Sequence, residues 1–259
     1  MNLTSPYVLP YDVYYQPSSI AAERDICLRI ALGHEVSSSR ADSIDSTVLP
    51  FLLMGTSGGL AGSSIEPWKS TVKDWSGPSI HDSAIEWQLK SIRIDPQGWV
   101  MLAQMLLVDH EDHLIERIEI RDLVDPSSLV KVITGQKGFN PYPRAWSGIR
   151  FLLGNSRDIS KSFTISAYFS RSLSEDEQAL ITEELQAWAP GLVFGAYGVA
   201  PIRPDECVAI PDEEIVVIGN HMEWTFSNFK AHSSAIEGLI NVFASVSEKY
   251  VPVSELRVD

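Results

Sequence analysis

The chain has little of what marks a secreted, membrane-spanning or metal-binding protein. Only two of its 259 residues are cysteines, Cys27 and Cys207, and their spacing fits neither a disulfide framework nor a zinc site. The longest apolar run, residues 48–54, is too short to cross a bilayer and contains Pro50. Residues 1–6 have no basic stretch leading into an apolar segment, so no secretory signal is predicted. Together these features predict a soluble, cytoplasmic protein.

The common cofactor motifs are also missing. The sequence has no P-loop, no dinucleotide-binding fingerprint, no zinc-ligand spacing and no kinase signature. No cofactor is therefore predicted, and the balance moves away from enzymes without excluding one of unfamiliar design.

Basic residues are scarce, and the shortage is unevenly distributed. The chain has 20 lysines and arginines against 34 aspartates and glutamates, a formal net charge of −14. Residues 1–150 hold 13 basic and 18 acidic side chains, whereas residues 151–259 hold 7 and 16. A negative field of this kind opposes nucleic acid and anionic membranes and speeds encounter with a basic partner. The same charge can also serve solubility alone.

One strand-then-helix pattern occurs twice, 137 residues apart and without a gap. Ile85-Glu86-Trp87 falls on Met222-Glu223-Trp224. Behind each triplet, apolar residues recur at helical spacing, with Trp99, Leu102, Ala103 and Leu106 matching Ile236, Leu239, Ile240 and Phe243. The repeat predicts a duplicated α+β architecture.

The second half reads as β-α-β-β-α-β, the split βαβ or ferredoxin-like order. Ser174 and Glu177 form a capping box at the start of a helix that Pro190-Gly191 should stop. Gly219-Asn220 predicts a hairpin turn. The expected strands are residues 163–169, 192–197, 222–229 and 251–258, and the expected helices are residues 174–188 and 234–250.

The first half can be given the same order. Strands are expected at residues 7–15, 48–54, 85–94 and 114–120, and helices at residues 19–32, closed by Gly33, and 97–108. Asp95-Pro96-Gln97-Gly98 is also a good type I turn, under which residues 85–121 would form a three-stranded meander. The glycine- and serine-rich residues 55–77 are expected to form a long exposed loop.

Glycine and proline punctuate residues 122–150, which we take as the connection between two halves. The fold class is thus α+β, with two tandem ferredoxin-like halves at residues 1–121 and 151–259. The halves either form separate units or pack as one pseudo-duplicated domain.

The first candidate for chemistry is the segment Gly55-Thr56-Ser57-Gly58-Gly59, a G-x-S-x-G pattern after an apolar run. In serine hydrolases such glycines allow a strained turn that presents the serine oxygen. Over six residues the segment resembles the nucleophile segment of patatin-like lipases. The chain departs from that family because it contains no Asp-Gly pair to supply the catalytic aspartate. A flexible connection explains the segment as well.

The second candidate is a cluster of five consecutive residues that can all ligate a metal, 109–113. His110, Asp112 and His113 are its candidate ligands. A divalent ion needs three or four ligands that converge on one point, and a contiguous turn rarely supplies more than two. A charged, solvated turn is the competing interpretation.

The charge pattern points instead to a binding surface. Acidic residues of the second half, Glu175, Asp176, Glu183, Glu184, Asp212 and Glu213, would steer a basic protein partner. Three tryptophans in irregular segments, Trp68, Trp75 and Trp146, would anchor it. We therefore expect a non-enzymatic protein-binding module, such as an acidic inhibitor or immunity-type protein that neutralises a toxin. A serine hydrolase using Ser57, or a metal-dependent enzyme using the 109–113 cluster, is the alternative.

Overall fold

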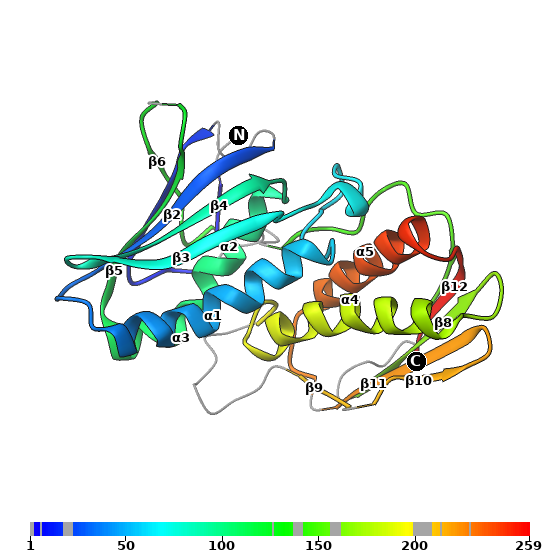
Figure 1. Ribbon diagram of the computed structural model, residues 1–259. Coiled ribbons are helices and arrows are strands. Elements are labelled where there is room, and N and C mark those ends of the chain that lie inside the picture. The colour runs from blue at the N-terminus through cyan, green and yellow to red at the C-terminus, as the bar shows by residue number, and fades with distance from the viewer. Residues whose placement is uncertain are drawn as a thin grey trace.

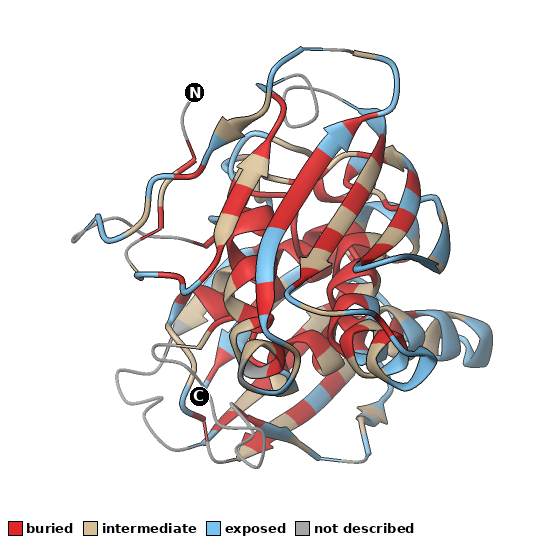
Figure 2. Cartoon of the chain, turned by 90° about the vertical axis from the view of Figure 1, so that its left-hand side faces the viewer, coloured by how far each residue is buried: buried red, intermediate tan, exposed pale blue. Residues whose placement is uncertain are grey.

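The computed structural model describes residues 3–5, 7–17, 23–125, 127–136, 142–155, 162–198, 209–212, 214–227 and 229–259. Within these ranges the chain forms a mixed α+β structure with two mixed β-sheets. The sheets lie on the outside and the helices between them, so that a sheet, two layers of helices and a second sheet follow one another (Figure 1). Figure 2 shows that burial concentrates in the helices and on the sheet faces that they cover.

The first sheet is built from residues of the first half. Its strands are β1 (Asp12–Tyr15), β2 (Arg24–Leu32), β3 (Asp74–His81), β4 (Ala84–Ile92), β5 (Ile115–Asp122) and β6 (Val130–Lys131), in the order β3-β4-β2-β5-β1-β6. In β2, the buried residues Ile26, Leu28 and Ile30 alternate with the half-buried Cys27 and Arg29. Since neighbouring side chains on a strand point to opposite faces, one face of the sheet is apolar and packs on helices, while the other carries polar and charged groups.

Helices α1 (Ser38–Thr56), α2 (Pro96–Met105) and α3 (Leu107–His113) belong to this half, with a short 3-10 helix, η2, at Pro67–Lys69. Ser37 and Asp95 cap α1 and α2, because their side chains accept hydrogen bonds from the backbone N–H groups of Arg40 and Gln97. Pro96, at the first position of α2, needs no hydrogen-bond acceptor. The helical interpretation of residues 97–108 is therefore confirmed over the meander.

The second sheet is built from the second half. Its strands are β7 (Leu152–Asn155), β8 (Phe163–Phe169), β9 (Ile210–Pro211), β10 (Val216–Ile218), β11 (His221–Ser227) and β12 (Val253–Val258). The order is β10-β11-β8-β12-β7, and β9 also pairs with β11. As predicted, Gly219 and Asn220 turn the hairpin, because Ile218 lies opposite His221.

Two long helices, α4 (Glu175–Val193) and α5 (Ser234–Lys249), cover the second sheet. The predicted capping box is confirmed at the start of α4: Ser174 Oγ accepts from the Glu177 N–H, and Glu177 Oε2 accepts from the Ser174 N–H. Each end of the box satisfies a backbone group that the helix leaves free. No helix in the described part of the chain is long and apolar enough to cross a membrane.

Elements of the two halves follow one another at a constant spacing. Residue 137 places beyond the start of α1 at Ser38 is Glu175, the first residue of α4, and the two helices end at Thr56 and Val193 with the same offset. Their N-caps, Ser37 and Ser174, keep it as well. In both sheets a hairpin (β3-β4 or β10-β11) lies beside the strand that precedes the long helix (β2 or β8), which in turn pairs with a later strand (β5 or β12).

The two helical layers contact each other directly, with α1 packed on α4 and η2 on α5. Glycines allow this close approach. A Cβ on Gly59 would lie 2.5 Å from Cδ1 of Trp188, and a Cβ on Gly238 would overlap the hydroxyl of Tyr197. Because interiors are close-packed, these positions admit no side chain without movement of a large aromatic.

The predicted order of the first half is wrong in its opening elements. Residues 19–32 were expected to be a helix, but those from Arg24 onward form β2, and Cys27 lies on a strand. Residues 48–54 were expected to be a strand, but they lie inside α1. A short apolar run does not distinguish a buried strand from a buried helix. Here contact with both the first sheet and α4 buries most of the run, so that its helical period is hidden.

Three boundaries also differ. The strand expected at residues 7–15 is reduced to β1. The strand expected at residues 192–197 is absent from the described structure, because α4 continues through Pro190 and Gly191 to Val193. Gly191 lies against Met54 of α1, and this contact holds the helix past the expected stop. Residues 55–77 are not one exposed loop, because Thr56 ends α1, the residues 57–61 are buried, and β3 begins at Asp74.

Candidate functional site

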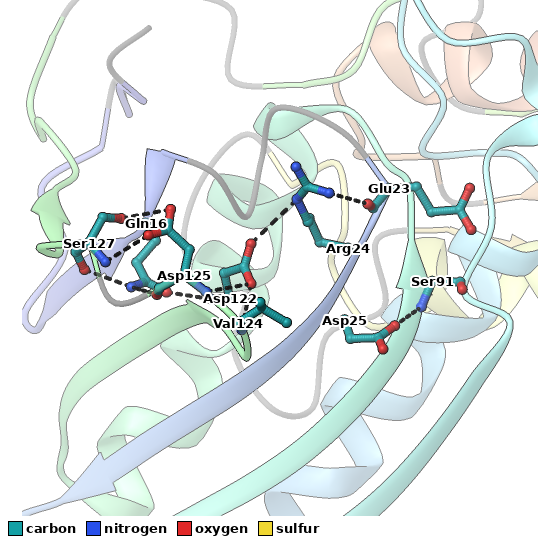
Figure 3. Close-up of polar contacts among 9 residues, drawn as sticks. All are labelled: Gln16, Glu23, Arg24, Asp25, Ser91, Asp122, Val124, Asp125 and Ser127. Atoms are coloured by element: carbon teal, nitrogen blue, oxygen red, sulfur yellow. Dashed lines mark hydrogen bonds and ion pairs between the residues drawn. The ribbon is translucent and has the colours of Figure 1, made fainter.

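A recess of about 520 Å³ opens at one end of the first sheet, where β2 begins and β4 and β5 end. It is lined by Glu23, Arg24, Asp25, Ser91, Asp122, Val124 and Asp125. Figure 3 shows these side chains around the ends of the strands. We call this site the acidic recess, because four of its seven lining residues are carboxylates and one is basic.

Asp122, the last residue of β5, organises the inner wall. Its side chain is 2% exposed, and its Oδ1 accepts from the backbone N–H groups of Val124, at 2.8 Å, and Asp125, at 3.1 Å. Its Oδ2 lies 3.5 Å from Nε of Arg24. An aspartate that accepts hydrogen bonds from the backbone two and three residues ahead fixes a tight turn. The negative charge of Asp122 is therefore held in place and partly neutralised.

Gln16 fastens the turn that follows. Its Nε2 donates to the carbonyl oxygens of Asp125 and Ser127, at 2.9 and 2.7 Å, while its Oε1 accepts from the Asp122 N–H. The Asp125 carboxylate accepts from the N–H and hydroxyl of Ser127. These contacts, drawn in Figure 3, hold residues 122–127 in one conformation.

The opposite wall is more exposed. Asp25 Oδ1 accepts from the N–H of Ser91 at 2.8 Å, and so secures a non-glycine residue with φ of 51°. Glu23 pairs with Lys73 at 3.0 Å, and the hydrogen bond from Lys73 lowers the pKa of Glu23 below its ordinary value. The recess thus keeps an excess of negative charge near neutral pH. It can accept hydrogen bonds from, and attract, a guanidinium or ammonium group.

Of the residues predicted to steer a partner, most lie on or near α4. Glu175, Asp176 and Glu183 are exposed on the helix, and Asp212 is exposed just after β9. Glu184 is half-buried and bound within the fold, to Nζ of Lys249 at 2.7 Å and the hydroxyl of Tyr250 at 3.0 Å. Glu213 lies outside the described residues.

An apolar groove of about 390 Å³ runs beside these acidic residues, between the C-terminal half of α4 and the β9–β11 edge. It is lined by Gln186, Ala189, Pro190, Val193, Phe194, Pro211, Asp212, Ile215 and Trp224. Trp224 lies in its wall with Nε1 donating to the Asp212 carbonyl at 3.0 Å. Phe194 is 49% exposed, an unusual state for a phenylalanine at the end of a long helix.

The predicted aromatic anchors do not gather at one place. Trp68 and Trp146 contact each other edge to face, with ring centroids 4.9 Å apart, and Trp146 N–H donates to Oδ1 of Asn241 on α5. Trp75 lies in β3 and packs against the core. All three are half-buried. None of them lines the acidic recess or the groove beside α4.

Ser57 lies at the C-terminal cap of α1 and is fully buried. Its hydroxyl donates to the carbonyl oxygen of Met54 at 2.9 Å. The glycines beside it contact Trp188, Pro67 and Ser245 at the junction of the two helical layers. This close packing explains the glycine-rich segment, and the hydrolase alternative stays a prediction.

The 109–113 cluster lies on α3, where its side chains have separate partners. Nδ1 of His110 is 3.0 Å from the Ile115 carbonyl oxygen, and Nε2 of His113 is 3.0 Å from Oγ of Ser43. Asp109 is buried, which raises its pKa to about 6, and Asp112 is exposed. Across the described ranges, no three histidine, cysteine, aspartate or glutamate side chains are grouped to hold a metal ion.

No protein-family model matches the chain, and no curated protein is significantly similar to it. The functional interpretation therefore depends on the geometry alone.

The acidic recess was not predicted. Its carboxylates come from segments that are about 97 residues apart in the sequence, and they meet because Ile26 of β2 pairs with Asp122 of β5. One signal was present: the alternation of Ile26, Leu28 and Ile30 indicates a strand, so Glu23 and Asp25 would stand at its start. The pairing partner still had to come from the fold.

Proposed function

We propose that the protein is a non-enzymatic binding module that holds a basic protein partner, in the manner of an inhibitor or an immunity-type protein. The observation that carries this proposal is the acidic recess, in which Glu23, Asp25, Asp122 and Asp125 face a single arginine of the lining, Arg24. The net charge of −14 supports it, because a field of one sign raises the rate of encounter with a partner of the other sign.

The arrangement of the recess suits a lysine or arginine side chain of the partner. Asp122 and Asp125 are held by hydrogen bonds from the backbone and from Ser127, so their positions are set before the partner arrives. Preorganised acceptors lose less conformational entropy on binding than mobile ones. The exposed carboxylates on α4, at Glu175, Asp176 and Glu183, would supply the longer-range attraction that steers the partner to the surface.

We further propose that the two halves are a duplicated ferredoxin-like unit. The constant offset of 137 residues between α1 and α4, and the shared order of strands in the two sheets, support this. Division into halves at residues 1–121 and 151–259, and a cytoplasmic location, stay predictions.

The test pairs two double variants that change the net charge equally. Glu23→Gln with Asp25→Asn neutralises one wall of the recess, and the asparagine can still accept from Ser91. Glu35→Gln with Glu116→Gln neutralises a second acidic recess of about 420 Å³ at the other end of the sheet. Proteins from the native host lysate are captured on the tagged wild type at low and high salt and identified by mass spectrometry. Association kinetics with the recovered partner are then measured.

We expect a basic partner whose capture weakens with salt. Neutralising Glu23 and Asp25 should slow association and weaken binding by about tenfold, since a charged contact contributes on the order of 1–3 kcal/mol. The Glu35 and Glu116 control should lose only the small part due to net charge. If no basic protein is retained, or if both double variants bind alike, the proposal is wrong.

A further inference from the structure

The apolar groove beside α4 has a counterpart in the first half, and there it is filled. Trp75 on β3 lies opposite Leu89 on β4. Leu89 and Phe226 are both buried and stand 137 residues apart, so they occupy equivalent places in β4 and β11. The residue opposite Phe226 is Pro211. At the place where the first sheet carries an indole, the second carries a proline.

Packing by the helices follows the same difference. Trp75 is half-buried and packs against the core, and α1 packs against β3. Among the residues that the structure describes, α4 makes no comparable contact with β9 or β10. The space remains open as the groove, with the aromatic ring of Phe194 exposed at its edge.

The rim of the groove is acidic. Asp212 lines it, Glu214 stands two residues further along the same wall, and Glu183 lies one turn before Gln186 on the exposed stripe of α4. No lysine or arginine is among the described residues of its lining. An apolar floor with an acidic rim is complementary to an aromatic side chain followed by basic residues.

We propose that this groove binds an aromatic side chain, best a tryptophan, that is flanked by lysine or arginine in the partner protein. The occupant would take the place that Trp75 takes in the first half. Its basic neighbours would pair with Asp212 and Glu183. This inference rests on the proposed function for the basic character of the partner, but the aromatic pocket stands on the comparison of the two sheets.

Three short peptides with blocked ends separate the two parts of the inference. They contain Gly-Trp-Lys-Lys-Gly, Gly-Ala-Lys-Lys-Gly or Gly-Trp-Glu-Glu-Gly, and each is titrated into the full chain by calorimetry and by amide chemical-shift mapping. We expect the first to bind at least about tenfold more tightly than the second, because a buried aromatic anchor contributes more than about 1.4 kcal/mol. The shifts should concentrate on Gln186, Val193 and Ile215.

Variants then test the location. Pro211→Trp places the chain's own indole where Trp75 lies in the first half, and Gln186→Trp covers the groove from an exposed helix position in case the first variant does not fold. Either should abolish binding of the tryptophan peptide. Ile218→Trp is the control, because Ile218 is 71% exposed and lies outside the groove lining.

Equal binding of the tryptophan and alanine peptides, or binding that survives both groove variants, overturns the inference. Loss of discrimination between Lys-Lys and Glu-Glu, with the preference for tryptophan retained, would support the pocket and contradict the basic partner of the proposed function. If the protein sediments as a dimer that Pro211→Trp dissociates, the occupant is a second copy of the chain and the inference is wrong.

Discussion

Gly59 lies directly against the indole of Trp188, where the helical layers of the two halves meet. A Cβ at this position would lie 2.5 Å from Cδ1 and 2.9 Å from Nε1 of the indole. Both residues come from segments that flank long helices or lie within them, and α1 packs on α4 nearby. The contact joins the first half to the second through the buried core rather than through the connecting segment.

The first prediction concerns this contact. Gly59→Ala should destabilise the protein by about 1–3 kcal/mol, the usual cost of overpacking a tight interior, because the buried Trp188 has to move. Urea unfolding measures the change. Gly33→Ala is the control, since a Cβ there would meet only the flexible side chain of exposed Glu116. Equal effects of the two substitutions would contradict the close contact.

The second prediction concerns pH. Burial raises the pKa of Asp109 from an ordinary value of 3.8 to about 6. The protonated form is favoured in the folded state, so its contribution to stability is full below about pH 4 and is lost as the pH rises through about 6. A shift of this size corresponds to about 3 kcal/mol.

Asp109→Asn removes that titration while keeping an oxygen that can accept the hydrogen bond from Thr47. We expect the variant to be more stable than the wild type at pH 7.5 and nearly equal to it at pH 4. The free energy of unfolding in urea at the two pH values measures this. Asp112→Asn, at an exposed position of the same helix, should show no such gain. A variant whose stability follows that of the wild type at both pH values would show that Asp109 does not titrate as described.

The third prediction concerns Ser57. Its buried hydroxyl donates one hydrogen bond to the Met54 carbonyl, so Ser57→Ala should cost about 1 kcal/mol of stability. Hydrolysis of an activated ester should be at the buffer rate for both the wild type and the variant. Turnover by the wild type that disappears in the variant would restore the serine hydrolase alternative.

The fourth prediction concerns the sign of the charge in the acidic recess. Arg24 lies beside the buried carboxylate of Asp122, and Arg24→Gln removes the positive charge from the recess lining. Association with the basic partner should become faster and more dependent on salt, opposite to the effect of neutralising Glu23 and Asp25. Arg40→Gln, a charge removed from α1, serves as the control. Slower association of the Arg24 variant would place the partner elsewhere.

Local signals predicted the second half well. The capping box of Ser174 and Glu177, the hairpin at Gly219 and Asn220 and the strand Phe163–Phe169 depend on side chains that act on neighbouring backbone, and the structure confirms all three. In the first half the same rules failed at residues 48–54, which lie inside α1. Contacts on several sides bury that helix, and amphipathic periodicity is a signal only where one face meets water.

The candidate sites show the same division. That Glu175, Asp176 and Glu183 would be exposed followed from the helical spacing around them, and they are. Their role in binding stays a prediction. The acidic recess required the pairing of β2 with β5, and the groove required the register that sets Pro211, rather than an aromatic residue, opposite Phe226.

Composition and local chemistry determined the charge of this protein, its α+β class and the caps and turns of its second half. These depend on interactions within a few residues or on counts that no fold can change. The meeting of Asp25 with Asp122, the burial of Ser57 and the open groove beside α4 were decided by tertiary structure. Each depends on strand register or helix packing between distant segments, where the free energy comes from burying surfaces that no local pattern brings together.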